Sequence, residues 1–283
     1  MALVENFSGY KPTWCPGCGN WGIIMALKTA LSNLNLNPAD ILVSFGVGCS
    51  GNENDFLNAY GFHALHGRSV PIAIGMKIAN HKMPVIVVVG DGDCYGEGGN
   101  HLLHAVRGNH NLTVIVHNNS VYGLTTGQAA PTARKGFKSK STPTGIIEKP
   151  LNPLSLVLTQ GASFVAQSFA GNVQHMTETI SKAIQHQGFS LVNILQPCVT
   201  FNKVYTYPYF LEHIYKLDEK YDPKNYEQAL NKTEEYVQEK FALGVIYQEE
   251  RSTYTDELKQ LNEATLVEKK RFNDFSSITS EFI

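Results

Sequence analysis

The sequence predicts an α/β protein built on a doubly wound, mostly parallel β-sheet. Two observations predict this class. Short runs of β-branched and aliphatic residues recur along the chain, at positions 41–45, 85–89, 112–116 and 191–195. Segments with amphipathic helical spacing lie between these runs. Strands that are buried on both faces are continuously apolar, and alternating strands and helices favour parallel pairing with right-handed crossovers.

The other elements continue this alternation. Helices are expected where apolar residues recur at every third or fourth position, at 21–34, 71–79, 98–107, 153–158 and 172–187. Residues 164–166 are expected in a strand. The segment 62–68 lacks a periodic pattern and is expected to be a loop. Residues 129–150 are polar and rich in Lys, Thr, Pro and Gly, which predicts a long loop that covers a site or contacts a partner.

The composition changes near residue 205, where the chain becomes more charged and aromatic. We expect residues 1–204 to form one domain that includes an N-terminal cysteine-containing knuckle. Residues 205–283 are expected to wrap around it as a helical extension, with helices at 225–243 and 256–269.

Composition also excludes several classes of protein. The net charge is −2 and no block of basic residues occurs, which argues against a nucleic-acid partner. The longest apolar run is far too short to span a membrane, and the N-terminus lacks the pattern of a signal peptide. We therefore expect a cytoplasmic protein with no membrane partner.

Two consecutive strands of the central βαβ unit end in polar side chains. The run 85–89 leads into Gly90-Asp91-Gly92-Asp93, and the next run leads into Asn118-Asn119. Ligands of doubly wound sheets bind at the carboxyl ends of strands, so Asp91 and Asn119 are expected to point at one place. Their oxygens, together with phosphate oxygens, suit Mg²⁺, and the glycines let backbone N–H groups approach a diphosphate. The alternative is an ordinary turn and loop, which a lone GDG would favour.

The chain has five cysteines, and a disulfide framework is not expected without a secretory signal. Cys15 and Cys18 form a C-x-x-C motif that suits half a zinc site, a redox-active dithiol or part of an iron–sulfur site. Cys49 and Cys198 follow the first and last strands, and therefore lie at the same edge of a parallel sheet as Asp91. The four thiolates could hold a zinc ion or a [4Fe–4S] cluster.

From about residue 14 to 202 the chain resembles the β subunit of the two-subunit 2-oxoacid:ferredoxin oxidoreductases. The motifs that carry the resemblance are W-C-P-G-C-G, G-x-G-C-S-G, G-D-G-D and N-N. The resemblance implies a subunit that binds thiamine diphosphate, Mg²⁺ and a [4Fe–4S] cluster. It implies CoA-dependent oxidative decarboxylation of a 2-oxo acid, 2-oxoglutarate and/or pyruvate, with the electrons passed to ferredoxin.

The resemblance also assigns roles to residues. It places the cluster on Cys15, Cys18, Cys49 and Cys198, while Cys94 lies outside the pattern and is expected to be a small filler side chain near the cofactor. Mg²⁺ is expected on the side chains of Asp91 and Asn119 and on the backbone carbonyl of Val121. The coenzyme is expected to contact Val47, Gly48, Cys49, Ser50, His66, Gly92, Asp93, Gly123 and Leu124. His63 is expected to be an ordinary loop histidine, and Arg68 to meet an anion or form a salt bridge.

One catalytic group is missing from this chain. Thiamine-diphosphate enzymes activate the coenzyme with a glutamate from a second domain of the same type, and no such domain is apparent. By resemblance, a separate α subunit supplies that glutamate, in an αβ or (αβ)₂ assembly. We therefore expect this chain alone to be inactive.

The sequence departs from the family pattern at Thr126. Archaeal members often have a lysine here, in L-T-K-G-Q, which could meet the distal carboxylate of 2-oxoglutarate; Lys135, Lys138 or Lys140 could substitute. No additional ferredoxin-like cysteine set occurs, so an external ferredoxin is expected. Two alternatives stay open: a non-redox thiamine-diphosphate decarboxylase or synthase subunit with structural zinc, and a non-catalytic subunit with a vestigial site.

Overall fold

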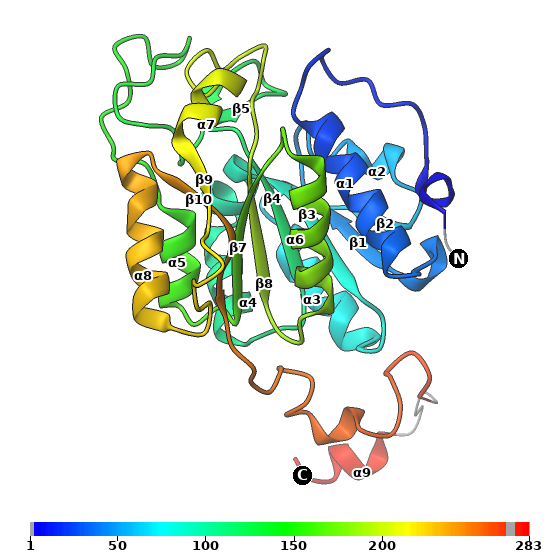
Figure 1. Ribbon diagram of the computed structural model, residues 1–283. Coiled ribbons are helices and arrows are strands. Elements are labelled where there is room, and N and C mark those ends of the chain that lie inside the picture. The colour runs from blue at the N-terminus through cyan, green and yellow to red at the C-terminus, as the bar shows by residue number, and fades with distance from the viewer. Residues whose placement is uncertain (1–2, 270–274, 283) are drawn as a thin grey trace.

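The computed structural model describes residues 3–269 and 275–282 and contains one large sheet with helices on both faces (Figure 1). Eight strands are arranged in the order β2-β1-β3-β4-β8-β7-β10-β9. All neighbouring strands are parallel except β10, which runs antiparallel to β7. This order, with strands added on both sides of β3 and β4, is the doubly wound arrangement that the sequence predicts.

The strands are short and mostly buried. Their bounds are β1 Leu42–Phe45, β2 Tyr60–His63, β3 Val85–Gly90, β4 Thr113–Asn118, β7 Phe164–Phe169, β8 Ser190–Leu195, β9 Ile214–Lys216 and β10 Phe241–Gln248. A two-stranded ribbon, β5 Val121–Tyr122 with β6 Gln128–Ala129, follows β4. The register aligns the carboxyl ends of the central strands, because Gly90 lies opposite His117 and Asn118 lies opposite Leu195.

Helices cover the two faces in separate layers. α1 (Asn20–Asn33) and α6 (Val173–Gln185) pack on one face, around a core that includes Ile23, Leu27 and Ile180. The other face carries α3 (Ser69–Ala79), α4 (Gly99–Arg107), α5 (Pro153–Thr159) and α8 (Tyr226–Glu234). Three short helices complete the structure: α2 (Glu53–Phe56), α7 (Tyr207–His213) and α9 (Ser276–Thr279).

Most of the predicted elements before residue 196 are confirmed to within a few residues, and residues 130–152 are irregular as expected. The loop prediction for 62–68 is wrong in part, because Phe62 and His63 belong to β2. All four residues of β2 are exposed at the edge of the sheet, so this strand lacks the apolar run that marks a buried strand.

The helix predictions beyond residue 205 are also wrong in part. The helix expected over 225–243 ends at Glu234 and a 3₁₀ turn, and Phe241 begins β10. Pairing with β7 decides the conformation of this segment. Within 256–269 the regular structure is a 3₁₀ turn at Lys259–Leu261. The division of the chain near residue 204 stays a prediction, although β9 and β10 extend the sheet of the preceding part.

Across residues 3–269 and 275–282, the helices are all too short or too polar to cross a membrane.

Candidate cofactor and cluster site

A pocket opens where β1, β3 and β4 end, and it contains every residue predicted to contact the coenzyme or Mg²⁺. Its lining residues are Val47, Gly48, Cys49, Ser50, His66, Gly90, Asp91, Gly92, Asp93, Asn119, Val121, Tyr122, Gly123, Leu124 and Thr125. The aligned strand ends bring together residues that are more than seventy positions apart in the sequence. The role of each residue stays a prediction at this point.

Asp91 is buried directly after β3. Its carboxylate accepts hydrogen bonds from the backbone N–H of Ser120, at 2.9 Å, and from the hydroxyl of Thr132. Burial raises the pKa of this carboxyl group to about 6, against the opposing effect of these donors. A cation beside Asp91 would counteract the effect of burial and favour the ionised form.

Asn119 lines the same pocket directly after β4. Its side-chain oxygen accepts the N–H of Val121 at 3.1 Å, and its amide group donates to Gln196 at 2.9 Å. Between Asn119 and Val121, Ser120 adopts a left-handed conformation with φ +60°, which turns the chain sharply before β5. This turn returns Val121 to the pocket that Asn119 faces.

Asp93 connects three loops at the rim of the pocket. One carboxylate oxygen accepts the N–H of Gly67 at 2.5 Å and lies 2.6 Å from Nδ1 of His66. The other accepts the N–H of Val47 at 3.2 Å. Any contact between Asp93 and a diphosphate is therefore left to its backbone. The sequence did not indicate this role of the second aspartate in GDGD.

Two residues that the sequence analysis missed, Glu97 and Tyr122, form contacts beside the first pocket. Nε2 of His66 lies 3.3 Å from the carboxylate of Glu97, and the hydroxyl of Tyr122 donates to the same carboxylate at 3.2 Å. Glu97 ends the π-helical segment Gly92–Glu97, and the ring of Tyr122 packs against this segment at Gly92. Single π-helical turns of this kind are frequent at functional sites. His63 is exposed on β2, and Arg68 donates to the carbonyls of Gly67 and Glu97, so neither lines this pocket.

A second pocket is lined by all four cysteines that were predicted to hold the cluster. Cys15, Cys18, Cys49 and Cys198 surround it together with Trp14, Gln196 and the segment 198–201. It shares Cys49, Asn119, Gly123 and Leu124 with the first pocket. Gly123 keeps the shared wall thin, since a Cβ atom there would lie 3.5 Å from Sγ of Cys49 and 3.6 Å from Sγ of Cys198.

Burial and hydrogen bonds define the environment of these thiols. Burial, with the neighbouring thiols, raises the pKa of Cys18 and Cys49 to about 11. The amide of Gln196 donates to Sγ of Cys18 at 3.4 Å, and the indole of Trp14 donates to the carbonyl of Cys49 at 2.7 Å. Cys94 is buried in the hydrophobic core and does not line the first pocket.

The four thiols line one pocket, but among the described residues they do not form a ready-made metal-binding group. A zinc ion needs its sulfur ligands about 2.3 Å from one centre. Within the part of the chain that the structure describes, no group of three or more Cys, His, Asp or Glu side chains meets the requirement for one metal ion.

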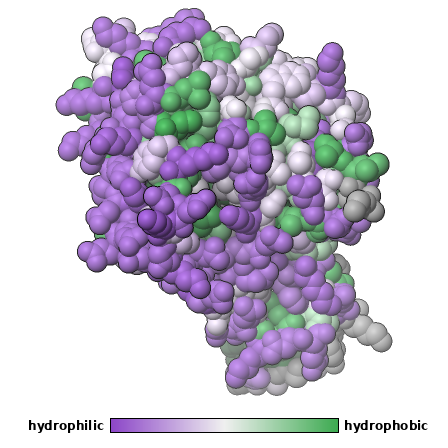
Figure 2. All heavy atoms as spheres, viewed as in Figure 1, coloured by the Kyte–Doolittle hydropathy of each residue, from purple (hydrophilic) through white to green (hydrophobic). Residues whose placement is uncertain are grey.

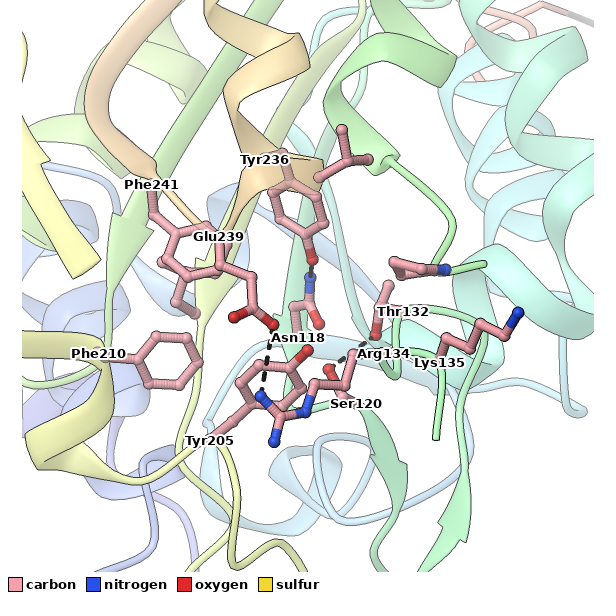
Figure 3. Close-up of a pocket in the computed structure, with 13 residues that line it drawn as sticks. Asn118, Ser120, Thr132, Arg134, Lys135, Tyr205, Phe210, Tyr236, Glu239 and Phe241 are labelled. Atoms are coloured by element: carbon pink, nitrogen blue, oxygen red, sulfur yellow. Dashed lines mark hydrogen bonds and ion pairs between the residues drawn. The ribbon is translucent and has the colours of Figure 1, made fainter. Parts of the chain in front are cut away.

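A third cavity lies on the other side of Ser120 and Thr132 (Figure 3). Arg134 and Glu239 form an ion pair across it, at 3.7 Å, and Asn118 donates to the hydroxyl of Tyr236 at 2.9 Å. Lys135 lines this cavity and not the first pocket. Thr126 does not line the first pocket either, although its neighbour Thr125 does. Lys138 and Lys140 line neither of these two pockets, so none of the three loop lysines stands at the predicted coenzyme site.

Comparison with known proteins identifies the class of the site. Residues 46–194 match the family described as thiamine pyrophosphate enzyme, C-terminal TPP binding domain. Residues 198–263 match the family that describes the C-terminal part of the pyruvate ferredoxin oxidoreductase β subunit. The fold and the first pocket are therefore those of a thiamine-diphosphate-binding α/β domain.

Individual relatives are named more specifically. The 2-oxoacid:ferredoxin oxidoreductase subunit β of Saccharolobus solfataricus is 47% identical over 78% of this chain and 72% of its own length. Subunit β of 2-oxoacid:ferredoxin oxidoreductase 1 of Aeropyrum pernix is 41% identical over 88% and 82%. The chain belongs to the family of 2-oxoacid:ferredoxin oxidoreductase β subunits, and it is thus part of an oxidoreductase.

A solved structure agrees with this assignment. The 2-oxoglutarate:ferredoxin oxidoreductase from Magnetococcus marinus, with 2-oxoglutarate, coenzyme A and succinyl-CoA bound, superposes with a TM-score of 0.92 at 33% identity. The match covers 99% of this chain and 96% of that one.

We predict that Gly46→Ala weakens coenzyme binding and destabilises the fold. A Cβ atom at this position would lie 1.7 Å from the carboxylate of Asp93 and 2.9 Å from Val89. The expected loss is about 1–3 kcal/mol in the free energy of unfolding, with weaker thiamine diphosphate binding by calorimetry. Gly75→Ala is the control, because a Cβ there meets open space within α3 and should stabilise the protein by about 0.5–1 kcal/mol. Equal effects of the two substitutions would contradict this account of Asp93.

Proposed function

We propose that this β subunit holds thiamine diphosphate with Mg²⁺ and a [4Fe–4S] cluster side by side, and oxidatively decarboxylates a 2-oxo acid together with an α subunit. The observation that carries the proposal is the thin wall between the two pockets, formed by Cys49, Asn119, Gly123 and Leu124. A coenzyme site that shares a wall of four residues with a four-cysteine site suits electron transfer between them. A simple decarboxylase does not need such an arrangement.

The residues of the first pocket fit Mg²⁺ and a diphosphate. Asp91 and Asn119 offer side-chain oxygens and Val121 a backbone carbonyl, all lining the same pocket. Gly92 leaves no room for a side chain, since a Cβ there would lie 2.3 Å from the ring of Tyr122. Its backbone can therefore stand close to phosphate oxygens.

The residues of the second pocket fit a [4Fe–4S] cluster on Cys15, Cys18, Cys49 and Cys198. Four thiolates are the usual ligand set of this cluster, and hydrogen bonds to the sulfurs adjust its potential. The amide of Gln196 supplies such a bond to Cys18. The alternative of a non-redox subunit with structural zinc is not favoured, because the relatives of this chain are named as subunits of ferredoxin oxidoreductases.

When bound, thiamine diphosphate supplies the electron sink for decarboxylation, and the cluster accepts electrons singly. Two electrons leave each 2-oxo acid, so two ferredoxin molecules are reduced while carbon dioxide and a proton are released and CoA takes the acyl group. Cys49 contributes to both pockets and Gly123 allows close approach. The protein therefore positions the donor against the acceptor.

The α subunit is needed for catalysis. No glutamate occurs among the residues that line the first pocket, and nearby Glu97 is engaged by His66 and Tyr122. We propose that this pocket is closed by the α subunit, which brings the activating glutamate, in an αβ or (αβ)₂ assembly. No Lys or Arg lines the pocket either, so a cation for the distal carboxylate of 2-oxoglutarate would also come from α. The relatives favour 2-oxoglutarate and/or pyruvate as substrate.

The proposal predicts an activity that depends on both subunits. The reconstituted αβ complex should reduce methyl viologen with 2-oxoglutarate or pyruvate when CoA, thiamine diphosphate and Mg²⁺ are present. The β subunit alone should show no turnover, because it lacks the activating glutamate. A panel of 2-oxo acids measures the choice of substrate, and turnover by β alone would contradict the division of the site.

Asp91→Ala should abolish Mg²⁺-dependent binding of thiamine diphosphate. The substitution removes a negatively charged oxygen ligand, and we expect the dissociation constant to rise about 100-fold or more. Calorimetry on the isolated β subunit, with and without Mg²⁺, measures the effect. Asp40→Ala is a control, since this exposed carboxylate only caps a 3₁₀ turn. Tight binding by Asp91→Ala would leave the site without its proposed metal ligand.

Cys198→Ser should lower the iron and acid-labile sulfide content and the visible absorption of the anaerobically purified subunit. The serine removes one of the four proposed cluster ligands, all of which line the second pocket. Cys94→Ser is the matched control, because this thiol is buried in the core away from the others and should leave the iron content unchanged. Stoichiometric zinc in place of iron in the unaltered subunit would overturn the cluster assignment.

A further inference from the structure

We propose that the outer surface of the cysteine knuckle is where an acidic one-electron carrier protein docks to take electrons from the cluster site. This surface, the knuckle face, consists of Cys15, Pro16, Gly17, Trp21 and Met25. The exposed Lys11 precedes Cys15 by four residues in the chain, and Lys203 contacts Val199 next to the knuckle. The inference rests on the proposed cluster, and it adds the direction in which electrons leave.

The cysteine site has an inner and an outer side. Cys18, Cys49 and Cys198 are partly buried, whereas Cys15 is exposed. Cys49 belongs to the wall shared with the coenzyme pocket. Cys15 lines the cluster pocket but not the coenzyme pocket. Pro16 and Gly17 are exposed as well. Electrons that enter beside Cys49 therefore have their shortest route to solvent at Cys15.

Apolar side chains stand next to this outlet. Trp21 and Met25 are one turn apart on α1 and are 38% and 49% exposed. The indole of Trp21 donates to the carbonyl of Cys15 at 3.1 Å, so its ring is fixed at the knuckle. The surface over α1 is paler and greener than the purple surface over α8 (Figure 2). Interfaces of transient electron-transfer complexes are small, and a patch of this kind is sufficient for one.

The charge of the knuckle face favours an acidic partner. Residues 6–39 and 196–211, which include the knuckle face, contain two exposed lysines, Lys11 and Lys203, and no aspartate or glutamate, while Lys28 is buried. The ammonium group of Lys203 is held by the carbonyl of Val199 at 2.5 Å. Val199 in turn packs on the knuckle, 3.8 Å from where a Cβ of Gly17 would lie. The ammonium group is thus placed beside the outlet.

One carboxylate borders this surface. Asp55 is exposed, and its backbone carbonyl accepts the N–H of Tyr10 at 2.8 Å, next to Lys11. Complementary charges steer protein partners together and suppress wrong ones, whereas a like charge slows association. The proposal therefore assigns opposite signs to the effects of changing Lys11 and Asp55.

The test compares two electron acceptors on the reconstituted αβ holoenzyme. With an acidic bacterial-type [4Fe–4S] ferredoxin, the double variant Lys11→Glu/Lys203→Glu should raise the KM for ferredoxin about tenfold at low ionic strength. Asp55→Asn should lower that KM about twofold. Both variants should reduce methyl viologen at the unaltered rate, because a small dye needs no docking surface. Added salt should reduce these differences.

The control is Lys224→Glu, which changes the charge by the same amount as either single substitution but lies at the opposite end of the sheet. Lys224 is exposed and follows Pro223, whose carbonyl accepts the N–H of Gln248. Gln248 pairs with Phe164, the first residue of β7, so Lys224 lies near the amino end of that strand. This variant should leave the KM for ferredoxin unchanged. An unchanged KM in Lys11→Glu/Lys203→Glu, or an equal rise in Lys224→Glu, would overturn the docking proposal. Failure of the unaltered complex to reduce methyl viologen would instead count against the proposed function.

Discussion

Three loops from distant parts of the chain meet on the carboxylate of Asp93, and the shape of the coenzyme pocket depends on that meeting. Val47, His66 and Gly67 all contact this one side chain. The contact is possible because Gly46 has no side chain to obstruct it. Burial raises the pKa of Asp93, while the donors around it favour its charged form. The rim is therefore held by an acid that does not need to touch the substrate.

A second set of contacts connects the two pockets. The amide of Asn119 donates to Gln196 at 2.9 Å, and Gln196 donates to Sγ of Cys18 at 3.4 Å. A proposed magnesium ligand and a proposed cluster ligand are thus joined through one glutamine. Groups that orient metal ligands in this way influence affinity and potential. Gln196 directly follows β8, so the alignment of the strand ends allows it to contact both Asn119 and Cys18.

The sequence was sufficient for the central sheet and for the composition of both pockets. Continuous apolar runs identified β1, β3, β4 and β8, and the polar residues that follow such strands must share an edge. The exposed strand β2 and the antiparallel strand β10 were not predictable in this way, because edge pairing and not local pattern determines them. The hydrogen bonds of Asp93, Glu97 and Tyr122 were missed because they depend on loops whose conformations no periodicity encodes.

The antiparallel direction of β10 determines where the chain goes next. This strand carries the chain away from the edge where the knuckle and both pockets open, and residues 249–269 continue on the opposite side (Figure 1). There Lys82, just beyond α3, pairs with Glu268 at 3.0 Å. A tether attached along this tail would hold the molecule with its redox centre facing away from the support. A protein immobilised on an electrode through the tail would thus hold its knuckle away from the surface and exchange electrons with it poorly. A tether near α1 would instead place the knuckle next to the electrode.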